Sequence, residues 1–338
     1  MAEEQVLTAK DFKSDQEIRW CPGCGDTAIF SSVTKALPEL GIKHEDYAFI
    51  SGIGCSSRFP YYINTYGFHG IHGRAAAIAS GVKVANPSLS VWEITGDGDA
   101  MAIGGNHFIH LIRRNIDLNL ILFNNQIYGL TKGQFSPTSN FGQVTKTSPY
   151  GTIERPFNPG ELTIGSQGSF FARTIDNNVK LTSEVLIEAA KHKGTSVVEA
   201  LQNCVIFNDD AYAAITDKAT KEDRQIILNH GKPMVFGKNS DKGLVLEGKK
   251  LKVVTLGQDG IGINDILVHD TKDPDPTIHL CLVRMNYPEL PVALGVIRAV
   301  EMPVYNELVV KQIEDIQSKS KIRCMDDLMN SGSTWIVE

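Results

Sequence analysis

Short apolar segments alternate with helical patterns along the first two thirds of the chain, and this alternation restricts the folds that the chain can adopt. Short apolar runs are typical of buried strands, whereas apolar positions three and four residues apart indicate helices. The runs typical of strands are residues 47–51, 89–95, 118–123 and 196–201. The helical patterns are residues 72–86, 101–113 and 181–192. Alternation of this kind predicts an α/β fold with a doubly wound parallel sheet.

The character of the sequence changes after Asn208, where charged segments interrupt the apolar pattern. We therefore expect a binding domain over residues 1–208 and a smaller C-terminal extension over residues 209–338. Residues 237–243 are typical of a hairpin turn. The segment 131–167 is rich in Gly, Pro, Ser and Thr and has little periodicity, which predicts a long ordered loop of the kind that covers functional sites.

The 338 residues are 42% hydrophobic and carry a net charge of −6, as in an ordinary globular protein. An acidic chain without a long basic run is not typical of nucleic-acid-binding proteins. The first residues are acidic without an apolar targeting segment, and no apolar run is long enough to cross a bilayer. We therefore expect a cytoplasmic protein that binds neither nucleic acid nor membrane. Cytoplasmic cysteines stay reduced, so the six cysteines are expected to be ligands or core residues.

Two polar motifs follow two of the expected strands. Gly96-Asp97-Gly98-Asp99 comes after residues 89–95, and Asn124-Asn125 comes after residues 118–123. A carboxylate and an amide at adjacent strand ends suit Mg²⁺, which takes oxygen ligands and often shares a diphosphate with the protein. A helix that starts near Asp97 would direct free N–H groups at that diphosphate. Gly-Asp-Gly alone also occurs as a simple tight turn, so the downstream Asn-Asn carries the argument.

The order strand, Gly-Asp-Gly, helix, strand, Asn-Asn resembles the thiamine diphosphate motif. In that motif an Asp, an Asn-type residue and a backbone carbonyl two residues later hold the metal. The resemblance implies that Asp97, Asn125 and the carbonyl of Ile127 hold Mg²⁺ in this chain.

The run Cys21-Pro22-Gly23-Cys24 is a CxxC motif, in which two thiolates can meet one metal centre. Such a motif can be half of a zinc site, a thioredoxin-like redox pair, half of an iron–sulfur site or two unliganded cysteines. The charged residues 13–19 do not resemble the strand that a thioredoxin-like motif follows. The sequence also lacks the second close pair that a zinc ribbon requires.

Two single cysteines add to the CxxC pair. Cys55 and Cys204 each follow an expected strand, at the sheet edge where the magnesium ligands are also expected. Four cysteines there can hold Zn²⁺ or a [4Fe–4S] cluster, and the residue types do not decide between them. Thiamine diphosphate decarboxylates 2-oxo acids, and a nearby electron acceptor makes that decarboxylation an oxidation, which favours the cluster because zinc accepts no electrons. Cys281 lies in an apolar run and is expected in the core, whereas Cys324 has no partner.

Five features of the sequence occur together in one enzyme family. They are Trp20-Cys21-Pro22-Gly23-Cys24-Gly25, Gly52-Ile53-Gly54-Cys55-Ser56-Ser57-Arg58, His72-Gly73-Arg74-Ala75, the pairing of Gly96-Asp97-Gly98 with Asn125, and Cys204. Together these features resemble the β subunit of a 2-oxoacid:ferredoxin oxidoreductase, over roughly the first two thirds of the chain. The resemblance implies one [4Fe–4S] cluster on the four matched cysteines, transfer of electrons to ferredoxin and transfer of the acyl group to coenzyme A, in one direction or the other.

The resemblance also implies the residues that bind the cofactor. They are Ile53, Gly54, Ser56, His72, Gly96, Asp97, Gly98, Asp99, Asn125, Tyr128, Gly129 and Leu130. His69 and His72 flank a glycine-rich loop, where a histidine can hydrogen-bond a diphosphate, an oxyanion or only the local backbone. We favour His72 as a catalytic residue because His72-Gly73-Arg74 matches the family.

The residues after Tyr128 bear on the choice of substrate. Pyruvate-acting relatives usually read Asn-Thr-Gly-Gly where this chain has Leu130-Thr131-Lys132-Gly133. A lysine near the thiazolium ring would pair with the distal carboxylate of a dicarboxylic 2-oxo acid, whereas pyruvate has only a methyl group there. We therefore predict 2-oxoglutarate as the substrate. Lys132 can instead point to solvent, and Arg58 is a second candidate cation that can instead serve a structural role or face another subunit.

Two features that the sequence lacks indicate partners. No Glu matches the family position that activates the aminopyrimidine ring, and in relatives that Glu comes from the α subunit, so we expect an αβ or α₂β₂ enzyme. A ferredoxin-type CxxCxxCxxxCP run is also missing, which implies a separate electron carrier. Two alternatives stay open: a non-oxidative thiamine diphosphate-dependent decarboxylase or carboligase, and a zinc-stabilised non-catalytic subunit.

Overall fold

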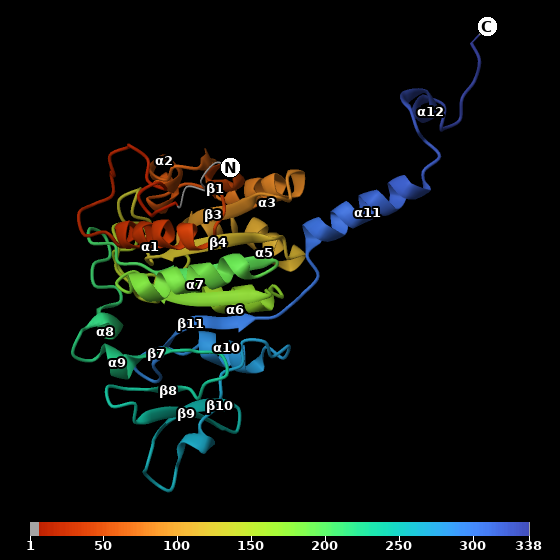
Figure 1. Ribbon diagram of the computed structural model, residues 1–338. Coiled ribbons are helices and arrows are strands. Elements are labelled where there is room, and N and C mark those ends of the chain that lie inside the picture. The colour runs from red at the N-terminus through yellow and green to blue at the C-terminus, as the bar shows by residue number, and fades with distance from the viewer. Residues whose placement is uncertain (1–6, 338) are drawn as a thin grey trace.

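The computed structural model describes residues 7–337 and shows a central sheet of eight strands (Figure 1). The strands are β1 (Tyr47–Ser51), β2 (Tyr66–His69), β3 (Ser90–Gly96), β4 (Leu118–Asn124), β5 (Phe170–Ile175), β6 (Thr195–Leu201), β7 (Gln225–Ile227) and β11 (Val292–Ala299). Their order in the sheet is β2-β1-β3-β4-β6-β5-β11-β7. Strands β1 to β6 are parallel, and β11 pairs antiparallel with β5. The predicted α/β fold with a doubly wound parallel sheet is confirmed, and β11 is an antiparallel strand that the prediction did not include.

Helices cover both faces of the central sheet, as a doubly wound fold requires. One face carries α1 (Gly25–Glu39) and α7 (Val179–Lys191), which pack against each other. The other face carries α3 (Ala75–Ala85), α5 (Gly105–Arg114), α6 (Pro159–Gly165) and α10 (Thr277–Val283). The short helices are α2 (Phe59–Tyr62), α4 (Asp97–Met101), α8 (Ala213–Thr216) and α9 (Lys221–Arg224).

The parallel strands are buried on both sides, and alternate side chains enter two separate cores. Along β1, Tyr47 and Phe49 join the core beneath α1 and α7, whereas Ala48 and Ile50 join the core on the opposite face. Successive side chains of a strand point to opposite faces, so a strand that is buried on both sides reads as a continuous apolar run. The apolar runs in the sequence have this cause.

The segment after Asn208 contributes to two sheets. Strands β7 and β11 extend the central sheet, so the expected division at residue 208 does not coincide with the edge of that sheet. A second, three-stranded antiparallel sheet contains β8 (Val235–Phe236), β9 (Lys242–Glu247) and β10 (Lys250–Thr255). Its β8–β9 connection is the predicted hairpin. Helices α11 (Tyr305–Lys319) and α12 (Met325–Met329) extend away from the rest of the molecule (Figure 1).

Some elements differ from the expectation. The helix expected over 101–113 begins later, as α5 at Gly105, because residues 102–104 form a turn after the short helix α4. Gly104 lets this turn pack closely, since a Cβ there would lie 2.4 Å from the carbonyl oxygen of Asp99. The segment expected as a loop over 131–167 ends with helix α6. Cys281 is half-buried on α10 and does not belong to the core. Among the described residues, no helix combines the length and the apolar character needed to span a bilayer.

Candidate active site

The two polar motifs lie side by side at the carboxyl edge of the central sheet. Strand β3 ends at Gly96, its neighbour β4 ends at Asn124, and Gly96 pairs with Phe123 in the register of the two strands. Asp97 begins helix α4 directly after β3, and Asn125 follows β4. In parallel sheets, ligands bind at this edge. The pairing of β3 with β4 therefore places Asp97 beside Asn125, as the sequence predicted.

A cavity of about 410 Å³ opens at this edge. All twelve residues that the sequence indicated for cofactor binding line it, together with Ile127, whose carbonyl was expected to hold the metal. The wall also contains four residues that were not expected to bind the cofactor or its metal. They are Cys55, Phe123, Thr131 and Gln134. Residues from four separate segments of the sequence (53–56, 72, 96–99 and 123–134) thus meet at one cavity.

Asp97 is almost completely buried, with 2% of its surface exposed. Burial raises the pKa of Asp97 to about 6, and hydrogen bonds from Ser136 and Thr138 partly oppose that rise. Both hydroxyl groups donate to Oδ2 of the carboxylate. A buried carboxylate without a cationic side chain beside it is a good partner for a bound metal ion.

The second expected metal ligand lies in a tight turn. The Oδ1 atom of Asn125 accepts a hydrogen bond from the Ile127 N–H at 3.1 Å, and Gln126 between them has a left-handed backbone with a φ of 57°. The Asn125 carbonyl accepts a hydrogen bond from the Asn208 side chain at 2.8 Å. These contacts fix the turn and bring Asn125 and Ile127 to the same cavity wall as Asp97.

Asp99 organises the loops around the cavity. Its Oδ1 atom accepts hydrogen bonds from the Ile53 N–H at 3.0 Å and the Gly73 N–H at 2.7 Å, and it lies 2.7 Å from Nδ1 of His72. Its Oδ2 atom accepts a hydrogen bond from the Thr95 hydroxyl at 2.8 Å. Four donors therefore occupy this carboxylate. Asp99 was expected among the cofactor-binding residues, and this stays a prediction; Asp99 lines the cavity, and its carboxylate also positions other residues that face it.

Tyr128 packs closely on the Gly-Asp-Gly turn. Its hydroxyl donates a hydrogen bond to the Gly98 carbonyl at 3.0 Å, and a Cβ at Gly98 would lie only 2.2 Å from the Tyr128 ring. Position 98 therefore accepts no side chain. Burial raises the pKa of Tyr128 to about 12, so its hydroxyl is a stable donor at neutral pH.

Four cysteines lie near one another: the two of the CxxC motif, and Cys55 and Cys204 at the strand ends. A Cβ placed on Gly129 would lie 3.4 Å from the Cys55 sulfur and 3.6 Å from the Cys204 sulfur, so the two sulfurs are no farther apart than the sum of these distances. Burial raises the pKa of Cys55 to about 12, and nearby Cys204 and Cys21 contribute to this rise. Burial also raises the pKa of Cys24, with contributions from Cys204 and Cys55.

Within residues 7–337, no three His, Cys, Asp or Glu side chains converge closely enough to hold one metal ion. A [4Fe–4S] cluster differs from a single ion because each of its four thiolates binds a different iron atom. Its ligands therefore lie farther apart than those of one zinc ion, which holds each thiolate at about 2.3 Å. The gathering of four cysteines is compatible with this wider spacing, and the cluster stays a prediction.

The two candidate cations occupy different environments. Arg58 lines a neighbouring cavity of about 310 Å³, which shares Ile53, Gly54 and Leu130 with the larger cavity. Its Nε donates a hydrogen bond to the Tyr62 hydroxyl at 2.8 Å. Lys132 is exposed, has a φ of 75° and lines neither cavity. The structure thus brings Arg58, and not Lys132, beside the expected cofactor site.

Comparison with known proteins bears on the identity of the chain. Residues 52–200 match the family model for the thiamine pyrophosphate enzyme, C-terminal TPP binding domain. Subunit beta of 2-oxoacid:ferredoxin oxidoreductase 1 from Aeropyrum pernix is 46% identical over 190 residues, which are 56% of this chain and 60% of that protein. The 2-oxoglutarate oxidoreductase subunit KorB of Mycobacterium tuberculosis is 46% identical over 338 aligned residues, which cover 99% of this chain and 90% of that protein. The chain belongs to the family of 2-oxoacid:ferredoxin oxidoreductase β subunits.

A solved structure of the same family has the same fold along nearly the whole chain. It is 2-oxoglutarate:ferredoxin oxidoreductase from Magnetococcus marinus with 2-oxoglutarate, coenzyme A and succinyl-CoA bound. It is 30% identical, covers 98% of both chains and gives a TM-score of 0.79. The resemblance that the sequence motifs indicated is confirmed. These relatives are subunits of oxidoreductases, and none of them is named as a zinc-stabilised non-catalytic subunit.

Proposed function

We propose that this chain is the β subunit of a CoA-acylating 2-oxoglutarate:ferredoxin oxidoreductase. In this reaction, 2-oxoglutarate and coenzyme A give succinyl-CoA and CO₂, and the two electrons that are released pass one at a time to oxidised ferredoxin. One observation carries the proposal: the same cavity wall contains Asp97, the expected metal ligand, and Cys55, an expected cluster ligand. The cofactor, from which the electrons are released, and the cluster, which accepts them, would then be neighbours.

The residues around the cavity fit Mg²⁺ and a diphosphate. Asp97 offers a buried carboxylate whose charge no cation of the protein neutralises within the described contacts. Asn125 and the Ile127 carbonyl would supply the other protein oxygens, and a diphosphate would complete the coordination that Mg²⁺ prefers. Thiamine diphosphate, when bound, supplies the electron sink that lets a 2-oxo acid lose CO₂.

The cysteine side of the cavity fits a cluster. Gly129 leaves open the space that a Cβ would fill beside Cys55 and Cys204. The Cys55 thiol is protonated at neutral pH in the absence of a metal, because burial raises the pKa of Cys55 to about 12. A cluster held by Cys21, Cys24, Cys55 and Cys204 would stabilise the thiolates. Such a cluster needs reduced cysteines, which supports a cytoplasmic location.

His72 is the proposed catalytic residue of this chain. Its Nδ1 faces the Asp99 carboxylate, which selects the tautomer with hydrogen on Nδ1 and leaves Nε2 able to accept or return a proton. His72 lines the cavity, so a reacting group there is within its reach.

2-Oxoglutarate is the proposed substrate. The names of the Mycobacterium tuberculosis relative and the Magnetococcus marinus structure refer to this 2-oxo acid. In this chain, Arg58 lines the cavity next to the cofactor site, and its guanidinium would pair there with a distal carboxylate. Lys132, the other candidate, would need to move to reach the same place, because it lines neither cavity.

An α subunit is the proposed partner, in an αβ or α₂β₂ assembly. The edge strand β2 exposes all four of its residues, and apolar side chains surround the adjacent cavities. Large exposed apolar residues in this region are Tyr61, Tyr66, Phe68, Ile71 and Leu130. A sheet edge and apolar side chains of this kind suit a protein interface. The α subunit would cover them and supply the glutamate that this chain lacks.

The activity can be tested on the enzyme assembled from this chain and its α subunit without oxygen. Reduction of ferredoxin should require both 2-oxoglutarate and coenzyme A, and pyruvate should support a far lower rate. Asp97→Asn should abolish the reduction. Release of CO₂ from 2-oxoglutarate without any reduction of ferredoxin would favour the non-oxidative decarboxylase instead.

A further inference from the structure

The carboxylate of Asp97 is held on one side by two hydroxyl groups. Ser136 Oγ donates to Asp97 Oδ2 at 2.5 Å, and Thr138 Oγ1 donates to the same oxygen. All three residues are at most 2% exposed. Among the described residues, no other side chain hydrogen-bonds Oδ1 of Asp97. The two hydroxyls therefore fix Oδ2 and leave Oδ1 without a side-chain donor, while the backbone N–H groups of Asp97 and Gly98 also hydrogen-bond the carboxylate.

Hydroxyl donors have a specific advantage here. An Arg or Lys beside Asp97 would neutralise the carboxylate and compete with a dication. Ser136 and Thr138 are uncharged, so they orient the carboxylate while it keeps its full negative charge. In metal sites, groups that hydrogen-bond a ligand set its orientation and tune the affinity for the metal.

The turn that carries the two hydroxyls is itself held in place. The Ser136 N–H donates a hydrogen bond to Ser139 Oγ at 2.8 Å, and Ser139 Oγ donates one to the Gln126 carbonyl at 2.6 Å. Gln126 lies between the expected metal ligands Asn125 and Ile127. Hydrogen bonds thus link the turn to the segment that carries the expected metal ligands.

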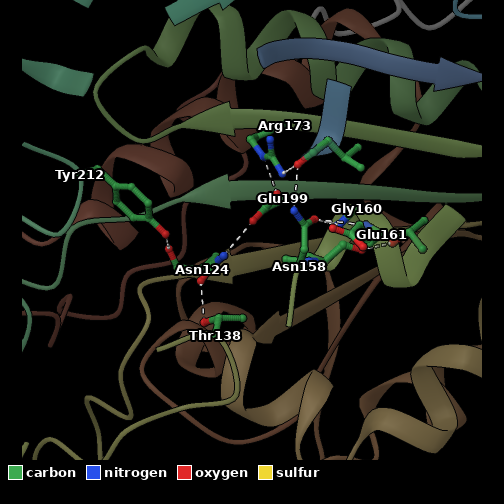
Figure 2. A network of polar contacts seen from close by, with 11 residues as sticks. Asn124, Thr138, Asn158, Gly160, Glu161, Arg173, Glu199 and Tyr212 are labelled. Atoms are coloured by element: carbon green, nitrogen blue, oxygen red, sulfur yellow. Dashed lines mark hydrogen bonds and ion pairs between the residues drawn. The ribbon is translucent and has the colours of Figure 1, made fainter. Parts of the chain in front are cut away.

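A buried polar chain backs Thr138 from the other side (Figure 2). Thr138 Oγ1 lies 2.9 Å from Asn124 Oδ1, and Asn124 Nδ2 donates a hydrogen bond to Glu199 Oε1 at 2.7 Å. Glu199 Oε2 accepts a hydrogen bond from Arg173 Nε at 2.6 Å. The Glu199 contact fixes the Asn124 amide with its oxygen toward Thr138, and the single hydroxyl hydrogen of Thr138 lies between two acceptors, Asn124 Oδ1 and the Asp97 carboxylate.

We infer that Ser136 and Thr138 are positioning residues for a divalent cation at Asp97, with the Asn124–Glu199–Arg173 chain as their support. This inference rests on the proposed magnesium site and adds residues that no sequence motif marks. Each hydroxyl contributes by orienting Asp97, so its loss weakens cation binding although no direct ligand is lost.

Titration with Mn²⁺ tests this inference. The enzyme assembled with its α subunit is freed of metal and cofactor, saturated with thiamine diphosphate and titrated, and free Mn²⁺ is measured by electron paramagnetic resonance. Ser136→Ala and Thr138→Val should each weaken Mn²⁺ binding about 10-fold or more, as is usual for groups that orient a metal ligand. Thr138→Ser keeps the hydroxyl and should bind Mn²⁺ almost as the unmodified enzyme does.

Thr163→Val is the matched control. Thr163 is a buried threonine on α6 whose hydroxyl donates to the Pro159 carbonyl at 2.7 Å, away from Asp97. If the hydroxyls have only a structural role, Thr138→Val and Thr163→Val should both lower thermal stability, and the two variants should bind Mn²⁺ with equal affinity. If Thr138→Val does not fold, the smaller change Ser136→Ala decides the question.

The outcomes separate this inference from the proposed function. Equal Mn²⁺ affinity in Ser136→Ala, Thr163→Val and the unmodified enzyme overturns the inference alone, provided that Asp97→Asn loses binding. Mn²⁺ binding that is unchanged in Asp97→Asn, or absent from the unmodified enzyme, overturns the magnesium site itself.

Discussion

Nδ1 of His72 lies 2.7 Å from Oδ1 of Asp99, which joins the proposed catalytic histidine to the Gly-Asp-Gly-Asp turn. The same carboxylate accepts the backbone N–H groups of Ile53 and Gly73. One acidic side chain therefore fixes both the cavity wall and the tautomer of the histidine. The second aspartate of the motif has a different task from the first, which faces the expected metal.

Replacement of Asp99 by Asn should lower kcat more than it changes KM. The amide keeps the shape of the carboxylate and one acceptor, but it loses the negative charge that holds His72 Nδ1–H. A positioned general acid or base contributes ~10²–10⁴-fold in rate. Because Asp99→Asn keeps His72 and only loosens its position, we expect a fall of about 10- to 100-fold in kcat, with KM for 2-oxoglutarate within a few-fold. Steady-state kinetics of the assembled enzyme measures both. A kcat equal to that of the unmodified enzyme would contradict the positioning role of Asp99.

Gly98→Ala should disturb the cofactor cavity. The new Cβ would meet the Tyr128 ring at 2.2 Å, and such overpacking costs about 1–3 kcal/mol. Because Tyr128 lines the cavity, thiamine diphosphate binding should weaken as well, which quenching of intrinsic fluorescence can measure.

Gly81→Ala on α3 is the control for this substitution, since a Cβ there has no neighbour within 4 Å. An alanine in a helix is favoured over glycine by up to ~1 kcal/mol, so this variant should be equally or more stable and should bind the cofactor normally. If both alanine variants bind thiamine diphosphate equally well, the close packing of Tyr128 on Gly98 is not required for the site.

Glu199→Ala should strongly destabilise the chain. The Arg173–Glu199 ion pair is buried, with at most 6% of either side chain exposed, and removal of one partner leaves an uncompensated buried charge. Such a change costs about 3–5 kcal/mol. The exposed pair Lys180–Glu184 is a control in which Glu184→Ala should cost at most ~0.5 kcal/mol. Urea unfolding of both variants measures the free energies, and similar values would contradict the importance of burial.

Stability should fall as the pH drops from 7 to 5, in part because of His192. Burial lowers the pKa of His192 from 6.5 to about 4, and its Nε2 lies 2.9 Å from Ser169 Oγ. The unfolded chain thus binds a proton near pH 6.5, whereas the folded chain does so only near pH 4. The contribution of His192 to the free energy of unfolding is therefore fully present above pH 6.5 and is lost as the pH falls toward 4. At pH 5 the loss is about 1–2 kcal/mol.

His192→Gln keeps a donor for Ser169 and removes the titrating group, so the slope of the unfolding free energy between pH 7 and pH 5 should decrease. A residual slope is expected because burial also lowers the pKa of His269 and of His279. An unchanged slope in His192→Gln would show that His192 does not titrate as its environment indicates.

The sequence was sufficient for the elements that leave a local pattern. Continuous apolar runs marked β1, β3, β4 and β6 because both faces of these strands are buried. Polar residues directly after such runs marked the site, because parallel strands end at a common edge. Strands β5 and β11 were missed, since their places in the sheet depend on pairing between segments more than a hundred residues apart.

The contacts within the site could not be derived from the sequence. The donors to Asp99 come from segments near Ile53 and His72, which no local pattern relates to it. Ser136 and Thr138 lie in a loop without periodicity, so nothing distinguishes them from other polar loop residues. The exposed position of Lys132 follows from the turn between Tyr128 and Gln134, which only the fold defines.

The content of iron, sulfide and zinc in the chain purified without oxygen tests the central claim most directly. About four irons and four sulfides per chain, with visible absorption that Cys55→Ala removes, is the result that a cluster beside the thiamine diphosphate site predicts. One zinc per chain without colour would contradict the account, since no electron acceptor would then lie at the cavity wall.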